Sequence, residues 1–192
     1  MIASKDRSGY FGASDTKFVT GNWGTKTFEK WWLEKLGLHK NNIDNEYTKA
    51  GNNYESKIID SLDIPNIERD KQIIIGKLRV NLDSNTEDEI IEIKTYNYEK
   101  GFNLNNNYIE QVQVQMYASG IHEAKIVAYG LVANDYKNYL NEIDKSRLSF
   151  HPIMYDEDFI NNKYLPRLNY LTQCLEKGTL PRIYEYRKKE EK

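Results

Sequence analysis

Two neighbouring segments, residues 77–83 and 90–96, constrain the fold more than any other feature of this sequence. In the first, KLRVNLD, apolar and polar residues alternate at every second position, which is the period of a β-strand. The polar segment SNTEDE separates it from the second, IIEIKTY, so the two segments predict a hairpin. Because apolar residues flank Glu92 and Lys94 on both sides, we expect a central strand. Burying charged side chains in such a strand is costly, so these two residues are candidates for a functional role.

Helical periodicity surrounds this hairpin. KTFEKWWLEKLG places Phe28, Trp31, Trp32 and Leu36 on one stripe and ends at a glycine. The expected further elements are helices over 26–37, 45–62 and 107–119, strands over 124–133 and 148–155, and a mostly helical stretch over 156–177 in which Pro166 makes a kink or a second start. This order predicts an α/β fold with a mixed central β-sheet flanked by helices.

The length of 192 residues and a hydrophobic content of 39% suffice for one domain. We expect a single domain, 1–192, composed of an N-terminal helical part (1–65), a central sheet and helix (66–135) and a C-terminal strand and helix (136–192). No apolar run is long enough to span a membrane, and the first residues lack the apolar core of a signal peptide.

Charge and cysteine content exclude several classes of protein. A net charge of −2 argues against a globally basic DNA-binding protein, although a local basic groove remains possible. The single cysteine, Cys174, allows neither a disulfide within the chain nor a four-cysteine zinc or iron–sulfur site. It lies among apolar residues, and a buried thiol in a reducing, cytoplasmic setting is the expected interpretation.

The predicted hairpin brings acidic residues together. Asp83 on the first strand and Glu92 on the second form a hard-oxygen site suited to Mg²⁺ or Mn²⁺. Lys94 follows on the same face, where it can orient an attacking water or stabilise charge on a phosphate. A Glu-X-Lys pair alone is most often a solvated strand edge, but the apolar flanks of this strand argue against that interpretation.

Two further segments add polar groups. In GNNYE, we expect Glu55 to share its side of the helix with Gly51 and Asn52 and not with Ile58 or Ile59; alone, it is an ordinary surface glutamate. In YIEQVQVQMY, Tyr108, Gln111 and Gln115 share one helical face beside an apolar stripe. Such glutamines either bind water, phosphate or a metal-bound water, or form the polar flank of a helix.

The segment RSGYFGASD (7–15) is either a turn into the first helix or an anion site. Ser14 or Asp15 can cap a short helix that ends near Gly21, and the Gly-Lys-Ser/Thr signature of a P-loop is absent. A helix N-terminus offers N–H groups to an anion, and Arg7 can add a bidentate contact. These residues alone leave both interpretations open, and the resemblance described below implies that Arg7, Ser14 and Asp15 bind a DNA phosphate.

The order of these motifs resembles the lambda exonuclease/YqaJ branch of the PD-(D/E)XK nucleases. The motifs that carry the resemblance are RSGYFGASD, GNNYE, LDSNTEDEIIEIK and YIEQVQVQMY, which extend to residue 117. The resemblance implies a restriction-endonuclease-like core, with Glu55, Asp83, Glu92 and the Ile93 carbonyl as metal ligands. It further implies that Lys94 is the catalytic lysine, that Gln111 holds the water, and that Arg7 and Ser14 bind the terminal phosphate.

The chain also departs from this family. Ser84 follows Asp83 where glycine is usual, and Asp88 is an alternative ligand if the hairpin register differs. Candidate DNA contacts are Tyr108, Gln113 and Trp23; base stacking by Trp23 is weighed against a core position, which we expect for Trp31 and Trp32.

The resemblance implies a Mg²⁺-dependent deoxyribonuclease, with Mn²⁺ as a substitute. It implies a 5′–3′ exonuclease that resects linear duplex DNA for phage-type recombination, beside a strand-annealing partner and as a trimeric ring. An endonuclease of the same superfamily and an inactive DNA-end-binding protein are the alternatives. Relatives with a four-cysteine iron–sulfur cluster are excluded by the single cysteine.

Overall fold

A computed structural model describes residues 8–39 and 46–183 of the chain. Its centre is a five-stranded mixed sheet in the order β1-β2-β3-β4-β5. β3 and β4 are parallel, and the other neighbouring pairs are antiparallel. The strands are β1 (Glu68–Ile75), β2 (Leu78–Asn85), β3 (Glu89–Asn97), β4 (Glu123–Leu131) and β5 (Leu148–Met154). The predicted α/β class and the central position of β3 are confirmed.

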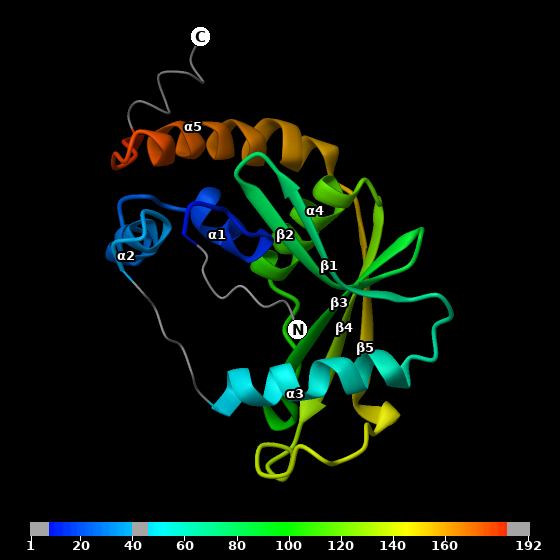
Figure 1. The fold of residues 1–192 in the computed structure, drawn as a ribbon. Coiled ribbons are helices and arrows are strands. Elements are labelled where there is room, and N and C mark those ends of the chain that lie inside the picture. Colours follow the sequence, from blue (N-terminus) through cyan, green and yellow to red (C-terminus); the bar gives the residue numbers. More distant parts are fainter. Residues whose placement is uncertain (1–7, 40–45, 184–192) are drawn as a thin grey trace.

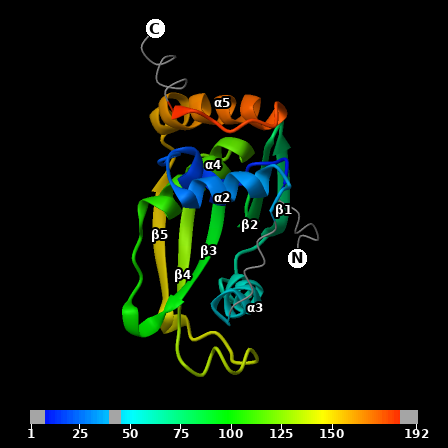
Figure 2. The ribbon, with the colours of Figure 1, turned by 90° about the vertical axis from the view of Figure 1, so that its left-hand side faces the viewer.

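Helices cover both faces of this sheet. The α-helices are α1 (Thr16–Val19), α2 (Lys26–Lys35), α3 (Glu46–Ser61), α4 (Asn106–Ser119) and α5 (Leu165–Glu176). One buried cluster joins α2, α4 and α5 to the sheet, and a second joins α3 to residues of β3 and β4. Figures 1 and 2 show α3 apart from the other helices, so the sheet lies between two helical layers.

Side-chain caps and a glycine set the ends of the helices, and the expected end of α4 at Gly120 is confirmed. The Thr25 side chain accepts the N–H of Phe28 at the start of α2, and the Asn105 side chain accepts that of Tyr108 at the start of α4. Gly120 ends α4 in the left-handed region with φ 75°, which favours glycine. Pro166 lies in the first turn of α5, after a π-helical segment Phe159–Tyr164, so it marks a second start.

Two features differ from the expectation. β1 was not predicted, because this edge strand is largely exposed and lacks the alternation that identified β2. Neither Ser14 nor Asp15 caps α1 through its side chain. Instead, a 3₁₀ turn (Ala13–Asp15) precedes α1, and the carboxylate of Asp15 accepts the N–H of Gly12 at 2.8 Å.

No helix in the described ranges is long and apolar enough to cross a membrane.

Candidate active site

Glu92 is the centre of a buried polar cluster on β3. Its side chain is 3% exposed. Oε1 accepts Lys94 Nζ at 2.6 Å and Gln111 Nε2 at 2.5 Å, and Oε2 accepts Gln115 Nε2 at 2.6 Å. The glutamines come from α4, which packs over this face of the sheet. The two segments predicted to supply chemistry therefore meet at one carboxylate.

Asp83 lies where β2 and β3 separate. Within the described residues, the two strands pair at Ser84–Ile91 and Asn85–Ile90. Beyond these pairs, a side chain takes the place of the backbone acceptor: Asp83 Oδ2 accepts the N–H of Ile93 at 2.8 Å. Ser84 is buried beside this point, and its Oγ donates to the Ile91 carbonyl at 3.3 Å. Asp88 lies exposed in the turn, so this register places Asp83 and not Asp88 at the cluster.

Glu55 approaches from α3 on the other layer. Gly51, one turn earlier on the same side of the helix, allows close approach to β3: a Cβ there would lie 3.2 Å from Thr95 Oγ1. Glu55 is close enough to Glu92 and Lys94 for their charges to act on its pKa. The helix thus brings a third acid to the site.

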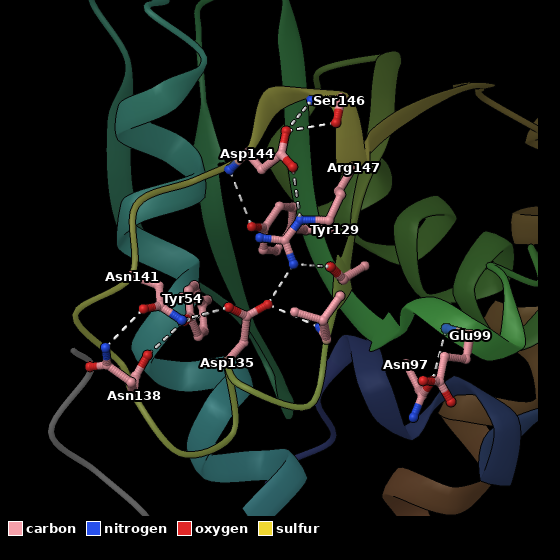
Figure 3. A network of polar contacts seen from close by, with 12 residues as sticks. Tyr54, Asn97, Glu99, Tyr129, Asp135, Asn138, Asn141, Asp144, Ser146 and Arg147 are labelled. Atoms are coloured by element: carbon pink, nitrogen blue, oxygen red, sulfur yellow. Dashed lines mark hydrogen bonds and ion pairs between the residues drawn. The ribbon is translucent and has the colours of Figure 1, made fainter.

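A buried network at the middle of α3 helps to fix this helix (Figure 3). The hydroxyl of Tyr54 donates to Asp135 Oδ1 at 3.2 Å, and Asp135 also pairs with Arg147 Nη1 at 2.5 Å. Asn141 and the N–H of Val132 donate to the same carboxylate. Because Tyr54 precedes Glu55, this network ties the acid to the loop after β4.

The charges of the site are not balanced. Burial raises the pKa of Asp83 well above its usual range, and the neighbouring charges of Glu92 and Glu55 raise it further. Burial also raises the pKa of Glu55, as do Glu92 and Asp70. Burial alone would lower the pKa of Lys94, but the charge and hydrogen bond of Glu92 raise it, so Lys94 is an ammonium. A cation placed among these acids would be favourable.

The donor set fits a hard divalent ion. Carboxylates and a backbone carbonyl are the ligands that Mg²⁺ and Mn²⁺ prefer. Across residues 8–39 and 46–183, no three His, Cys, Asp or Glu side chains already form a metal-binding group. Here Glu92 Oε1 accepts Lys94 and Gln111, and Asp83 Oδ2 accepts the N–H of Ile93, so a bound ion would compete with these hydrogen bonds.

A pocket of about 220 Å³ opens beside Asp83 and Gln111. The N-terminal segment forms its wall, because Phe11 bridges to β2: its N–H donates to the Lys77 carbonyl and its carbonyl accepts the N–H of Arg79, both at 2.8 Å. Gly12, Ser14 and Asp15 then line the pocket. Ser14 therefore lies at the site, whereas Arg7 is outside the described residues.

Comparison with known proteins gives a match in fold. No protein-family model and no curated protein match the sequence. The crystal structure of an alkaline exonuclease (LHK-Exo) from Laribacter hongkongensis matches with a TM-score of 0.64 at 20% identity, over 89% of this chain and 92% of that chain; its complex with dAMP matches equally. A phage-related exonuclease from Haemophilus somnus matches with a TM-score of 0.64 at 15% identity, over 88% and 96%. The chain has the fold of these exonucleases. The fold implied by the family resemblance is confirmed.

Two residues of this site were not singled out from the sequence. Arg79 lines the pocket, and its guanidinium lies over the ring of Tyr10 at 5.2 Å. The alternation of β2 places Arg79 on the polar face with Asp83, and this pattern could have indicated that Arg79 lies at the site. Lys35 lines the pocket as well and pairs with Asp15 at 2.5 Å. The sequence around Lys35 did not indicate a role at the site, because Lys35 belongs to α2 and polar residues are common on the surface of such a helix.

Two of the candidate DNA contacts lie in the protein core. Trp23 is 7% exposed and stacks on Tyr170, so it belongs to the core, as do Trp31 and Trp32. Gln113 is 3% exposed; its amide donates to the Met154 carbonyl and accepts the N–H of Asp156. Neither Trp23 nor Gln113 can reach DNA, and both predictions were wrong.

The carboxylate of Asp15 is fully engaged inside the protein. Asp15 is buried, and Gly12, Trp31 and Lys35 all donate to its carboxylate. An anion engaged in this way does not bind a phosphate directly, so the prediction for Asp15 was wrong. The carboxylate instead shapes the turn that carries Ser14.

Tyr108 is half-buried. Its ring stacks on Phe102, and Lys94 Nζ lies 5.1 Å from the ring centre. It therefore borders the cluster.

Proposed function

We propose that the chain is a divalent-metal-dependent deoxyribonuclease, most specifically an exonuclease that resects linear duplex DNA from 5′ ends. The observation that carries the proposal is the convergence of Glu55, Asp83, Glu92 and Lys94 in the gap between β2 and β3, beside an open pocket. The fold shared with LHK-Exo and the phage-related exonuclease supports the same chemistry. LHK-Exo was also crystallised with dAMP, the kind of mononucleotide that this reaction would release.

The residues divide into three roles in this proposal. Asp83, Glu92, the Ile93 carbonyl and Glu55 would hold Mg²⁺ or Mn²⁺, which supplies Lewis-acid polarisation of the scissile phosphate and offsets its charge. Lys94 orients the attacking water and stabilises developing charge; its raised pKa favours these roles over proton removal. Gln111, which touches both Lys94 and Glu92, holds the water in line.

The pocket would hold the DNA backbone. Ser14, Arg79 and, by the family resemblance, Arg7 supply donors for phosphate oxygens. Contacts to phosphate carry no sequence information, so cleavage is expected to be independent of sequence. A recombination role, a strand-annealing partner and a trimeric ring stay predictions of the family resemblance.

Active-site variants test this proposal. Lys94→Ala and Asp83→Ala should each abolish Mg²⁺-dependent degradation of linear duplex DNA, because one removes the water-orienting ammonium and the other a metal ligand. Gel analysis of a duplex substrate with Mg²⁺ or EDTA measures the loss, and circular dichroism verifies the fold. Glu99→Ala, an exposed acid outside the cluster, is the control and should keep full activity. Wild-type rates in either site variant would refute the assignment.

A further inference from the structure

Gln115 contacts the site from the protein interior and does not line the pocket. It lies on α4 one turn after Gln111, is 1% exposed, and donates from Nε2 to Glu92 Oε2 at 2.6 Å. The same nitrogen reaches the Asn81 carbonyl of β2 at 3.3 Å. One buried amide therefore joins the helix to both strands that carry the acids.

The two oxygens of Glu92 have different surroundings. Oε1 accepts Lys94, whose side chain is 19% exposed, and Gln111, which lines the pocket. Oε2 accepts the buried Gln115. Oε1 is thus on the accessible side, whereas Oε2 is held within the protein. A carboxylate fixed by one oxygen can present the other to an ion without rotating freely.

The orientation of the Gln115 amide follows from its surroundings. A flipped amide would place its oxygen against Oε2 of Glu92, which is repulsive, so the N–H₂ group must face the carboxylate. Oε1 of Gln115 then has no hydrogen-bond partner within the described part of the chain. Leaving a buried acceptor without a partner costs free energy, which an apolar residue at this position would avoid.

We propose that Gln115 is a positioning residue that fixes Glu92 for divalent-metal binding. The inference rests on the proposed function, because it assumes that Glu92 is a metal ligand. It assigns Gln115 no contact with DNA, water or the scissile phosphate. Removing an outer partner of a metal ligand typically weakens metal affinity about 10–100-fold, and we expect this range for loss of the Gln115 amide.

Gln113 offers a matched control. It lies two residues earlier on α4, is buried to a similar extent, and has both of its amide hydrogen bonds with backbone groups at Met154 and Asp156. Replacing either glutamine by methionine keeps the chain length and helix propensity while removing the amide. Both variants lose buried hydrogen bonds, but only Gln115→Met loses a contact with Glu92.

The experiment measures Mn²⁺ binding by titration calorimetry on the full chain without DNA. We expect Gln115→Met to bind Mn²⁺ about 10–100-fold more weakly than the wild type, and Gln113→Met to bind it with wild-type affinity. Urea unfolding of each variant verifies that the protein is folded, and Gln115→Leu serves if the methionine variant does not fold. In activity assays, the Mg²⁺ concentration for half-maximal rate should rise for Gln115→Met in the same proportion.

Three results would overturn the inference. Wild-type Mn²⁺ affinity in a folded Gln115 variant would show that the amide does not position the ligand. An equal loss in Gln113→Met would attribute the effect to general loosening of α4. A wild-type protein that binds no Mn²⁺ and degrades no DNA would refute the proposed function and the inference together, which distinguishes that failure from the first two.

Discussion

At the scale of single residues, Asp83 shows most clearly that the site is arranged for a cation. Its carboxylate is placed beside Glu92 and Glu55, and burial and these two charges raise its pKa. A folded-state pKa above the unfolded value means that the ionised group destabilises the protein at neutral pH, and that stability rises as the pH falls through the raised pKa. Active sites often carry such a cost in stability.

Asp83→Asn should therefore stabilise the metal-free protein. Asparagine resembles the protonated acid, and its side-chain oxygen can still accept the N–H of Ile93. We expect an increase of about 1 kcal/mol in the free energy of unfolding at pH 7 in EDTA. Mg²⁺ should raise the melting temperature of the wild type but not of the variant, because binding to the folded state stabilises it. A variant less stable than the wild type in EDTA would contradict this account of the charges.

Arg79 should contribute to DNA binding through the phosphate backbone. Arg79→Ala is expected to weaken duplex binding several-fold and to reduce the slope of log K against log salt by about 0.9, the value for one lost phosphate contact. Fluorescence anisotropy in EDTA over a range of salt measures both. Arg69→Ala is the control, because Arg69 lies on β1 and pairs with Asp60 at the surface. An unchanged slope in Arg79→Ala would remove this residue from the proposed interface.

At the scale of elements, α3 depends on the loop that follows β4. The pair of Asp135 and Arg147 is buried and holds Tyr54 of α3. Burial alone would raise the pKa of Asp135, but hydrogen bonds from Asn141, the N–H of Val132 and Arg147 lower it. The stability that this network supplies is thus present above the unfolded pKa and is lost as the pH falls through the folded value.

Asp135→Asn should destabilise the protein by about 3 kcal/mol at pH 7, because it removes the buried charge partner of Arg147 and leaves only the exposed Asp144 among the described residues. Urea unfolding measures the difference, which should shrink as the pH falls from the unfolded pKa of Asp135 toward its lowered folded pKa. Asp144→Asn provides the comparison: Asp144 is an exposed neighbour of the same arginine at 3.5 Å, and we expect a change below about 0.5 kcal/mol. Equal effects of the two substitutions would contradict the role given to Asp135.

Periodicity identified β2, whose alternate residues are buried, and this strand carries Asp83. β3 and α4 are largely buried, and their apolar residues identified them as the elements that carry Glu92, Lys94 and Gln111. β1 is an exposed edge strand without either pattern. The position of Trp23 depends on Tyr170, which lies far along the chain, and the Asp135 network depends on a loop contact. Contacts of this kind leave no local pattern in the sequence.

At the scale of the whole molecule, the site exists because the sheet opens. β2 leaves β3 after two ladder pairs, and the N-terminal segment runs alongside β2 to form one wall of the pocket. α4 and α3 then close the gap from the two faces of the sheet (Figure 1). The arrangement places a pocket of about 220 Å³ beside a cluster of acids, which is consistent with the proposed nuclease.

The most direct test of the central claim is a time course on duplex DNA labelled at either the 5′ or the 3′ end, with a covalently closed circle of the same sequence as control. With Mg²⁺, we predict that the linear duplex loses its 5′ label first as mononucleotides, that the circle stays intact, and that EDTA stops the reaction. Cleavage of the circle at the same rate would indicate an endonuclease. Binding of DNA ends without cleavage in Mg²⁺ or Mn²⁺ would contradict the account as a whole.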